Sequence, residues 1–211
     1  LQDWADRNDV IVLGIPRGGV IVAAEIAARL HAPLDVFLTH KLGAPGNPEL
    51  AIGAVADDGT TLLDEQLIET LGISDQHIQR ERDTQLRLMQ ARAARYRQGR
   101  PPPDVSGRCV IVCDDGIATG ATALAALECL RRRQPTWLIL AVPVAPPQSV
   151  ARLSTACDEI VTLATPDPFY AVGRFYQRFE QVSDEQVIAA LEQYSHGAQN
   201  DLFGEGDGDE G

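Results

Sequence analysis

Two adjacent aspartates, Asp114 and Asp115, follow the apolar run 110–113 and are the residues best suited to chemistry. Carboxylates accept hydrogen bonds and bind Mg²⁺, so the pair suits the vicinal hydroxyls of a sugar or a metal ion. The loop 116–120 that follows is rich in small residues and leads into a helix predicted at 121–133. The first N–H groups of such a helix have no partner within it and attract an anion. The segment therefore predicts a site for a sugar 5-phosphate.

The composition of this loop indicates which kind of anion it can bind. Its small residues let an anion approach the backbone, and its threonines can donate hydrogen bonds from their hydroxyls. The chain has no G-x-x-x-x-G-K-[ST] run, as triphosphate-binding loops have, and no G-x-G-x-x-G run, as dinucleotide-binding loops have. We therefore expect a monophosphate at this loop.

Two further segments can bind or cover an anion. Residues 15–19 (IPRGG) follow the first predicted strand and open a helix, so their N–H groups form a second anion cradle, to which Arg17 adds a positive charge. The run 41–49 holds two glycines and two prolines, so we expect neither helix nor strand there. Such a loop can close over a ligand, and Lys41 could neutralise charge on it. An exposed charge at a strand end is the alternative role for Lys41.

Short apolar runs alternate with helical patterns, which predicts a parallel sheet covered by helices on both faces. Predicted strands cover residues 10–15, 34–39, 51–56, 110–113, 136–144 and 159–164. Predicted helices cover residues 20–30, 64–72, 74–98, 121–133, 147–154 and, behind a capping box of Ser183 and Gln186, 183–194. The helix at 74–98 has an apolar seam, and we interpret its other, arginine-rich face as solvated. The arginines of that face are Arg80, Arg82, Arg87, Arg92, Arg95 and Arg97.

Composition and charge exclude several classes of protein. The 211 residues, 45% of them hydrophobic, are enough for one domain with its own core. The net charge of −12 argues against a general nucleic-acid binder, and no apolar run reaches the ~20 residues that cross a bilayer. The four cysteines are interpreted as core residues of a reducing compartment, and the first ten residues contain no apolar signal core, so we expect a cytoplasmic protein. Residues 195–211 hold five acids and no Lys or Arg, and are predicted to be a disordered tail.

The thirteen residues 110–122, VIVCDDGIATGAT, resemble the phosphoribosyl-pyrophosphate (PRPP) motif of the type I phosphoribosyltransferases at every position. The stretches 14–19 (GIPRGG), 41–55 and 165–173 (TPDPFYAVG) further resemble a bacterial subgroup described only as phosphoribosyltransferase-like. The resemblance implies an α/β fold, with an open, mainly parallel sheet flanked by helices and a small hood region.

This resemblance also implies a division of the chain. We expect one domain over residues 1–194, with the hood at about 165–182 and an inserted helix at about 74–98. Type I relatives commonly form dimers, so the resemblance is compatible with a homodimer, although the sequence itself does not determine the oligomeric state.

The resemblance assigns roles to individual residues. Asp114 and Asp115 would hold the ribose hydroxyls of PRPP and, mostly through PRPP, Mg²⁺. The residues implied to bind the 5-phosphate are Ile117, Ala118, Thr119, Gly120, Ala121 and Thr122. Those implied to bind the pyrophosphate are Arg17, Gly18 and Gly19, and we predict a cis peptide bond between Pro16 and Arg17. In the hood, Asp167, Phe169 and Tyr170 would face the base, or would instead form a small apolar core of the hood.

The implied reaction is a Mg²⁺-dependent transfer of ribose 5-phosphate from PRPP to a base-like acceptor, with release of pyrophosphate. Asp114, Asp115, Arg17 and Lys41 would be its catalytic residues. Ala118 stands where hypoxanthine-type enzymes carry an aspartate, which argues against a hypoxanthine-guanine assignment. The alternative is a regulatory protein that binds PRPP or a nucleotide without turnover, because a fold does not determine its function. A kinase resembling PRPP synthetase would need an ATP site, and the sequence shows none.

Overall fold

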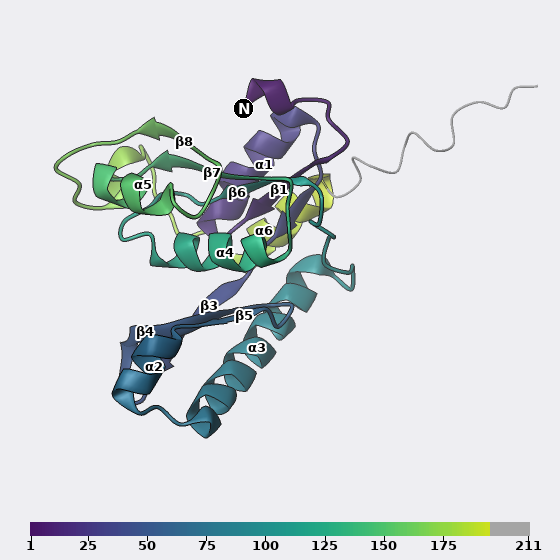
Figure 1. Cartoon of the computed structure of the whole chain (residues 1–211). Coiled ribbons are helices and arrows are strands. Elements are labelled where there is room, and N and C mark those ends of the chain that lie inside the picture. The colour runs from purple at the N-terminus through teal and green to yellow at the C-terminus, as the bar shows by residue number, and fades with distance from the viewer. Residues whose placement is uncertain (195–211) are drawn as a thin grey trace, which may run out of the picture.

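A computed structural model describes residues 1–194, and its centre is a five-stranded parallel sheet (Figure 1). The sheet order is β2 (Leu34–Val36), β1 (Val10–Gly14), β6 (Cys109–Cys113), β7 (Trp137–Val144) and β8 (Glu159–Ala164). Every neighbouring pair of these strands is parallel. The strands β1, β2 and β6 are buried along their whole length, which explains the continuous apolar sequences of β1 and β6. The predicted class of fold, with a parallel central sheet flanked by helices, is confirmed.

Helices cover both faces of the sheet, as predicted (Figure 1). Buried side chains of α1 (Gly18–Leu30) and α6 (Asp184–Tyr194) belong to one apolar cluster, and those of α4 (Ala121–Arg132) and α5 (Pro147–Leu153) belong to another. Alternate residues of β1 contribute to the two clusters, because successive side chains of a strand point to opposite faces. The capping box that opens α6 is formed by Ser183 and Gln186, with hydrogen bonds of 2.8 and 3.3 Å.

The chain between β2 and β6 forms a second layer, which Figure 1 shows below the main sheet. Three antiparallel strands, β3 (Thr39–Ala44), β4 (Asn47–Ala56) and β5 (Thr61–Leu63), make a separate sheet. The helices α2 (Glu65–Leu71) and α3 (Asp75–Arg97) follow it, close to their predicted bounds. The strand predicted at 51–56 therefore belongs to this antiparallel sheet and not to the parallel one.

The prediction that residues 41–49 form neither helix nor strand is wrong, because they belong to the hairpin of β3 and β4. The tight turn is made by Pro45 and Gly46, and Gly46 has a φ of +72°, which glycine adopts at little cost. The pairing shifts register at Gly43, where a Cβ atom would lie 2.7 Å from Cα of Pro48. The glycines and prolines thus serve a turn and an irregular strand pairing.

Arg97 also differs from its prediction. It is the last residue of α3 and is buried, with an exposed fraction of 5%, whereas the sequence placed it on the solvated face. Its guanidinium donates to Asp35 (2.9 Å), to Asp57 (2.7 Å) and to the Val36 carbonyl (2.9 Å). Arg97 therefore joins α3, the end of β2 and the turn after β4. Among the predicted solvent-facing arginines, Arg80, Arg87, Arg92 and Arg95 are exposed.

The structure also tests the predictions about the cysteines and about membrane-spanning helices. All four cysteines are free and buried, which confirms them as core residues. No helix within residues 1–194 is long and apolar enough to span a bilayer. The 3₁₀ helices η1 (Gln2–Trp4) and η2 (Val172–Phe175) were not predicted; η1 brings Trp4 to Trp137, with ring centroids 6.3 Å apart. The predicted tail at 195–211 lies outside the described residues.

Candidate active site

The two predicted anion-binding loops follow neighbouring strands. In the order β2-β1-β6-β7-β8, the chain runs outward from β1 to β2 on one side and from β6 to β8 on the other. The strand order therefore reverses between β1 and β6, and ligands of open α/β sheets bind at the carboxyl ends of the strands at such a point. Gly14 at the end of β1 pairs with Cys113 at the end of β6. This register brings the loop 15–19 beside Asp114 and Asp115.

The glycines of the first loop allow this close approach. A Cβ atom on Gly18 would collide with the Asp115 carboxylate, and one on Gly19 would lie 2.5 Å from the Cys113 carbonyl oxygen. The N–H of Ile15 donates to the same Cys113 oxygen at 2.9 Å and fixes the loop to the end of β6. The peptide bond between Pro16 and Arg17 is cis, as predicted.

The two aspartates form an electrostatically unsatisfied pair. Asp114 Oδ1 accepts a hydrogen bond from the Asp115 N–H at 2.9 Å. Burial, and secondly the charge of Asp115, raise the pKa of Asp114 to about 7, and burial also raises the pKa of Asp115. Neither carboxylate has an ion-pair partner in the part of the chain that the structure describes. A site that lacks a positive charge in this way fits Mg²⁺ or the hydroxyl donors of a sugar.

Three hydrogen bonds from other elements hold the turn between the acids and the phosphate loop. The N–H of Ile117 donates to the Val144 carbonyl at the end of β7 (2.8 Å), and the Ser149 hydroxyl of α5 donates to the Ala118 carbonyl (2.7 Å). The Tyr176 hydroxyl donates to the Asp115 carbonyl at 2.6 Å. Sequence analysis missed Ser149 and Tyr176. The only available signal was that Ser149 follows the strand predicted next to the motif.

The remaining N–H groups of the loop are available to a ligand. Within residues 1–194, the N–H groups of Ala118, Thr119 and Gly120 donate no hydrogen bond, and α4 begins at the next residue. Thr119 and Thr122 are exposed. Ile117, which the sequence analysis also assigned to the 5-phosphate, has a buried side chain and an N–H that donates to Val144, so it has no free donor for a ligand. The loop and the start of α4 therefore form an anion site open to solvent.

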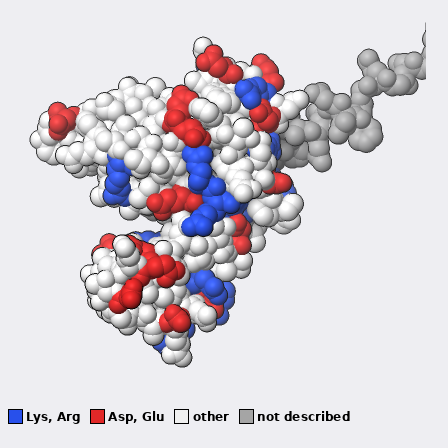
Figure 2. Space-filling view, in the orientation of Figure 1, with Lys and Arg blue, Asp and Glu red and all other residues white. Residues whose placement is uncertain are grey.

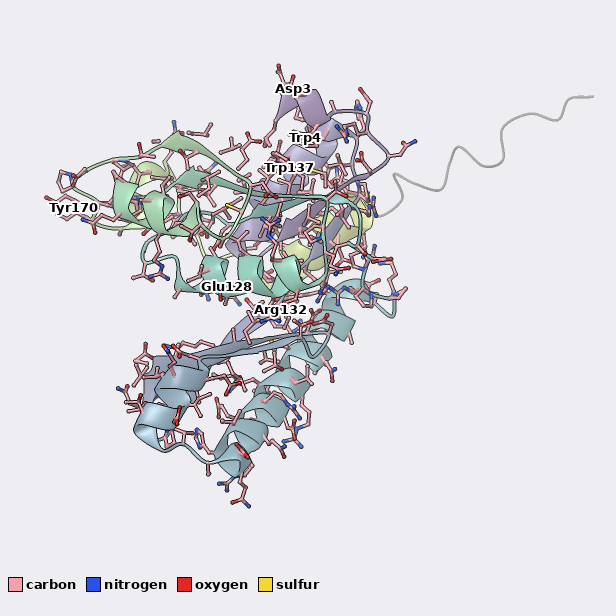
Figure 3. The ribbon with its side chains drawn as sticks, in the orientation of Figure 1. Asp3, Trp4, Glu128, Arg132, Trp137 and Tyr170 are labelled. Atoms are coloured by element: carbon pink, nitrogen blue, oxygen red, sulfur yellow. The ribbon has the colours of Figure 1, made fainter. Side chains whose placement is uncertain are left out.

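A cleft separates this loop from the second layer. Its volume is 880 Å³, and it lies between the three-stranded sheet and α4, whose Glu128 and Arg132 face the second layer in Figure 3. Thr119 and Thr122 line one wall, and Lys41 lines the other, where its Nζ pairs with Glu49 at 2.7 Å. Figure 2 shows basic side chains gathered at the waist of the molecule and acidic ones over α2. Lys41 thus faces the predicted phosphate loop across the cleft.

Two of the predicted base-facing residues of the hood, Phe169 and Tyr170, contact other side chains of the hood. Phe169 stacks on Phe175, with ring centroids 5.5 Å apart, and Tyr170 is 71% exposed and lies under Arg174. Figure 3 shows Tyr170 at the outer end of the hood. Asp167 precedes a proline with a cis peptide bond. The role of these residues toward a base stays a prediction.

A later part of the hood does reach the site. A cavity of 290 Å³ is bounded by Arg17, Gly18 and Asp115 on one side and by residues 179–182 on the other. Asp184, at the start of α6, lies 4.0 Å from the Arg17 guanidinium. The hood therefore closes over the loop that contains Arg17.

Comparisons with known proteins agree with this geometry. A family model described as "Phosphoribosyl transferase domain" matches residues 1–176. Two proteins of Mycobacterium tuberculosis, from strains CDC 1551 and H37Rv and each named "Putative phosphoribosyl transferase", are 45% identical over 183 residues. That match covers 87% of this chain and 41% of theirs, so the chain spans less than half the length of these relatives. The crystal structure of TT1426 from Thermus thermophilus matches with a TM-score of 0.80 and 43% identity over 90% of both chains. With a family model matched over residues 1–176, and with an acid pair and two candidate anion-binding loops at the reversal point of its sheet, this chain belongs to the phosphoribosyl transferase domain family.

Proposed function

We propose that the site binds PRPP with Mg²⁺ and transfers its ribose 5-phosphate group to a nitrogen of a base-like acceptor. One observation carries the proposal: the acid pair lies between two loops, one at the start of α1 and one at the start of α4, that contain N–H groups without an acceptor in residues 1–194. PRPP has two anionic ends joined by a diol, so its charge pattern matches this order of groups.

The roles follow from position in the site. The N–H groups from Ala118 to Thr122 would bind the 5-phosphate, and those from Arg17 to Gly19 would bind the pyrophosphate. Asp114 and Asp115 would accept hydrogen bonds from the ribose hydroxyls and hold Mg²⁺, which neutralises the departing pyrophosphate when bound. Asp167, Phe169 and Tyr170 remain the residues proposed to face the base.

The chemistry needs positively charged groups beside the departing pyrophosphate and negatively charged groups near the ribose ring. The bond between the anomeric carbon and the pyrophosphate oxygen breaks, a carbon–nitrogen bond to the acceptor forms, and the acceptor nitrogen loses its proton. Arg17 and Lys41 stabilise the pyrophosphate as it leaves, and the carboxylates stabilise the positive charge that develops on the ribose. The second layer lies across the cleft from α4 and would limit the access of water once a substrate fills the cleft.

The proposal also includes the bounds of the domain and the location of the protein in the cell. We treat residues 1–194 as one domain, in which the hood at 165–182 and the layer between β2 and β6 both serve the same site. Four free, buried cysteines fit a reducing compartment, which supports the cytoplasm.

Calorimetry tests the binding step, and an assay for pyrophosphate tests the transfer. Wild-type protein should bind PRPP in the presence of Mg²⁺ and release pyrophosphate with at least one of a panel of purines, pyrimidines and simple heterocyclic amines. Asp115→Asn should bind PRPP at least ~10-fold more weakly, because a charged hydrogen bond contributes about 1.5–3 kcal/mol. The exposed variant Asp3→Asn should not change the affinity. Binding without release for every acceptor would favour the regulatory protein, and an absence of binding would refute the proposed function.

A further inference from the structure

The hood contacts the acid pair at one polar point. Tyr176 directly follows η2, and its hydroxyl donates a hydrogen bond of 2.6 Å to the backbone carbonyl of Asp115. A second contact joins Val172 of the hood to Gly116, the residue after Asp115. The two are so close that a Cβ atom on Gly116 would lie 2.5 Å from Cγ1 of Val172. The hood therefore packs on the turn that carries the acids, although 61 residues separate Tyr176 from Asp115.

This contact completes the restraint of Asp115. Its N–H is held by the Asp114 carboxylate at 2.9 Å, and its carbonyl is held by Tyr176. With both backbone polar groups occupied, the peptide planes on either side of Asp115 have fixed orientations, and so has its Cα–Cβ bond. The Asp115 carboxylate also packs against Gly18, so closely that any side chain at position 18 would collide with it.

The side chain of Tyr176 is packed within the hood. The tyrosine is half-buried, and its ring lies 5.1 Å from the ring of Phe179.

We propose that Tyr176 is a positioning residue, which holds Asp115 in place and thereby gives the site its preference for sugar phosphates with vicinal hydroxyls. The inference rests on the proposed function, because it assumes that the acid pair faces a ribose. A site that hydrogen-bonds a hydroxyl discriminates strongly against an analogue without it, but only while its acceptor stays in position. Tyr176 does not need to touch the sugar for this effect, since it acts through the backbone of Asp115.

The test compares ribose 5-phosphate with 2-deoxyribose 5-phosphate by calorimetry in the presence of Mg²⁺. Wild-type protein should prefer ribose 5-phosphate by about 10-fold or more. Tyr176→Phe removes one hydroxyl and should reduce this preference to about 2-fold, while the affinity for inorganic phosphate, which needs only the loop and α4, stays the same. Tyr194→Phe is the matched control, because that hydroxyl lies at the end of α6 and accepts from Gln193. The control should keep the wild-type preference.

A second variant approaches the same contact from the other side. Gly116→Ala inserts a Cβ atom where Val172 packs, so it should separate the hood from the turn and also reduce the preference. Thermal melting shows whether each variant is folded before binding is measured. A purely structural role for Tyr176 would lower the affinity for all three ligands together.

The outcomes separate the inference from the function on which it rests. If wild-type protein does not distinguish the two sugars, both are wrong. If wild-type protein distinguishes them and a folded Tyr176→Phe or Gly116→Ala variant does so equally well, the inference alone is overturned.

Discussion

Replacing Asp114 by asparagine should stabilise the fold above pH 7. Burial and the nearby Asp115 raise the pKa of Asp114 from its ordinary 3.8 to about 7 in the folded protein. In the unfolded chain the carboxyl ionises near its ordinary value, so between about pH 4 and 7 the folded state holds a proton that the unfolded state has lost. The free energy of unfolding therefore falls as the pH rises through this window, and the loss is complete above pH 7.

The size of the effect follows from the shift. A difference of about three pKa units corresponds to ~4 kcal/mol, and the partial exposure of the side chain makes about 2–4 kcal/mol the better expectation. An asparagine carries no charge and can still accept the Asp115 N–H through its Oδ1 atom. For a domain of this length, each kcal/mol changes the melting temperature by about 2–4 °C. We therefore expect Asp114→Asn to melt about 5–10 °C above wild type at pH 8.

Differential scanning calorimetry at pH 4.5 and pH 8 tests this expectation. The two proteins should melt close together at pH 4.5, where Asp114 is protonated in the folded state, and diverge by pH 8. Asp3→Asn, at the surface of η1 and away from the site in Figure 3, should match wild type at both pH values. An equal melting temperature for Asp114→Asn and wild type at pH 8 would refute the reasoning, and so would a gain of the same size at pH 4.5.

Further variants test three other contacts. Arg97→Met should destabilise the fold by about 3–5 kcal/mol in urea unfolding, because it leaves buried Asp35 without its ion-pair partner and Asp57 with Arg133 at 3.9 Å. Exposed Arg87→Met should cost less than ~0.5 kcal/mol. Ser149→Ala should weaken the binding of inorganic phosphate about 3- to 10-fold in calorimetry, since a loop carbonyl loses its donor; unchanged binding would show that α5 does not hold the loop. Glu49→Gln should free Lys41 and strengthen pyrophosphate binding a few-fold at low salt, whereas Lys41→Met should weaken it, and equal affinities in both variants would argue against a role for this lysine.

Local patterns in the sequence predicted most of the main layer. The buried strands have continuous apolar runs, and the helices between them have clear start and stop signals, so their bounds were close to those observed. The acid pair and the two glycine loops were recognised because their chemistry is local, with the acids, the small residues and the helix start all within thirteen residues. The close approach of Gly18 to Asp115 follows from this pattern once β1 and β6 are neighbours.

The second layer was predicted less well, and the reason is long-range packing. Residues 41–49 contain glycines and prolines that are typical of a loop, yet the pairing of β3 with β4 overrides that preference. Arg97 sits in an arginine-rich stretch that is typical of a solvated helix face. Its burial depends on Asp35, which lies 62 residues earlier in the chain.

The sequence by itself determined the class of fold, the two anion-binding loops and the acid pair, because each depends on residues close together in the chain. Only the tertiary structure decided which side chains hold these groups in position. Ser149 lies 31 residues from the carbonyl that it binds, and Tyr176 lies 61 residues from its own. No periodicity or motif marks such pairs, since they form only when β7, α5 and the hood pack against the end of β6.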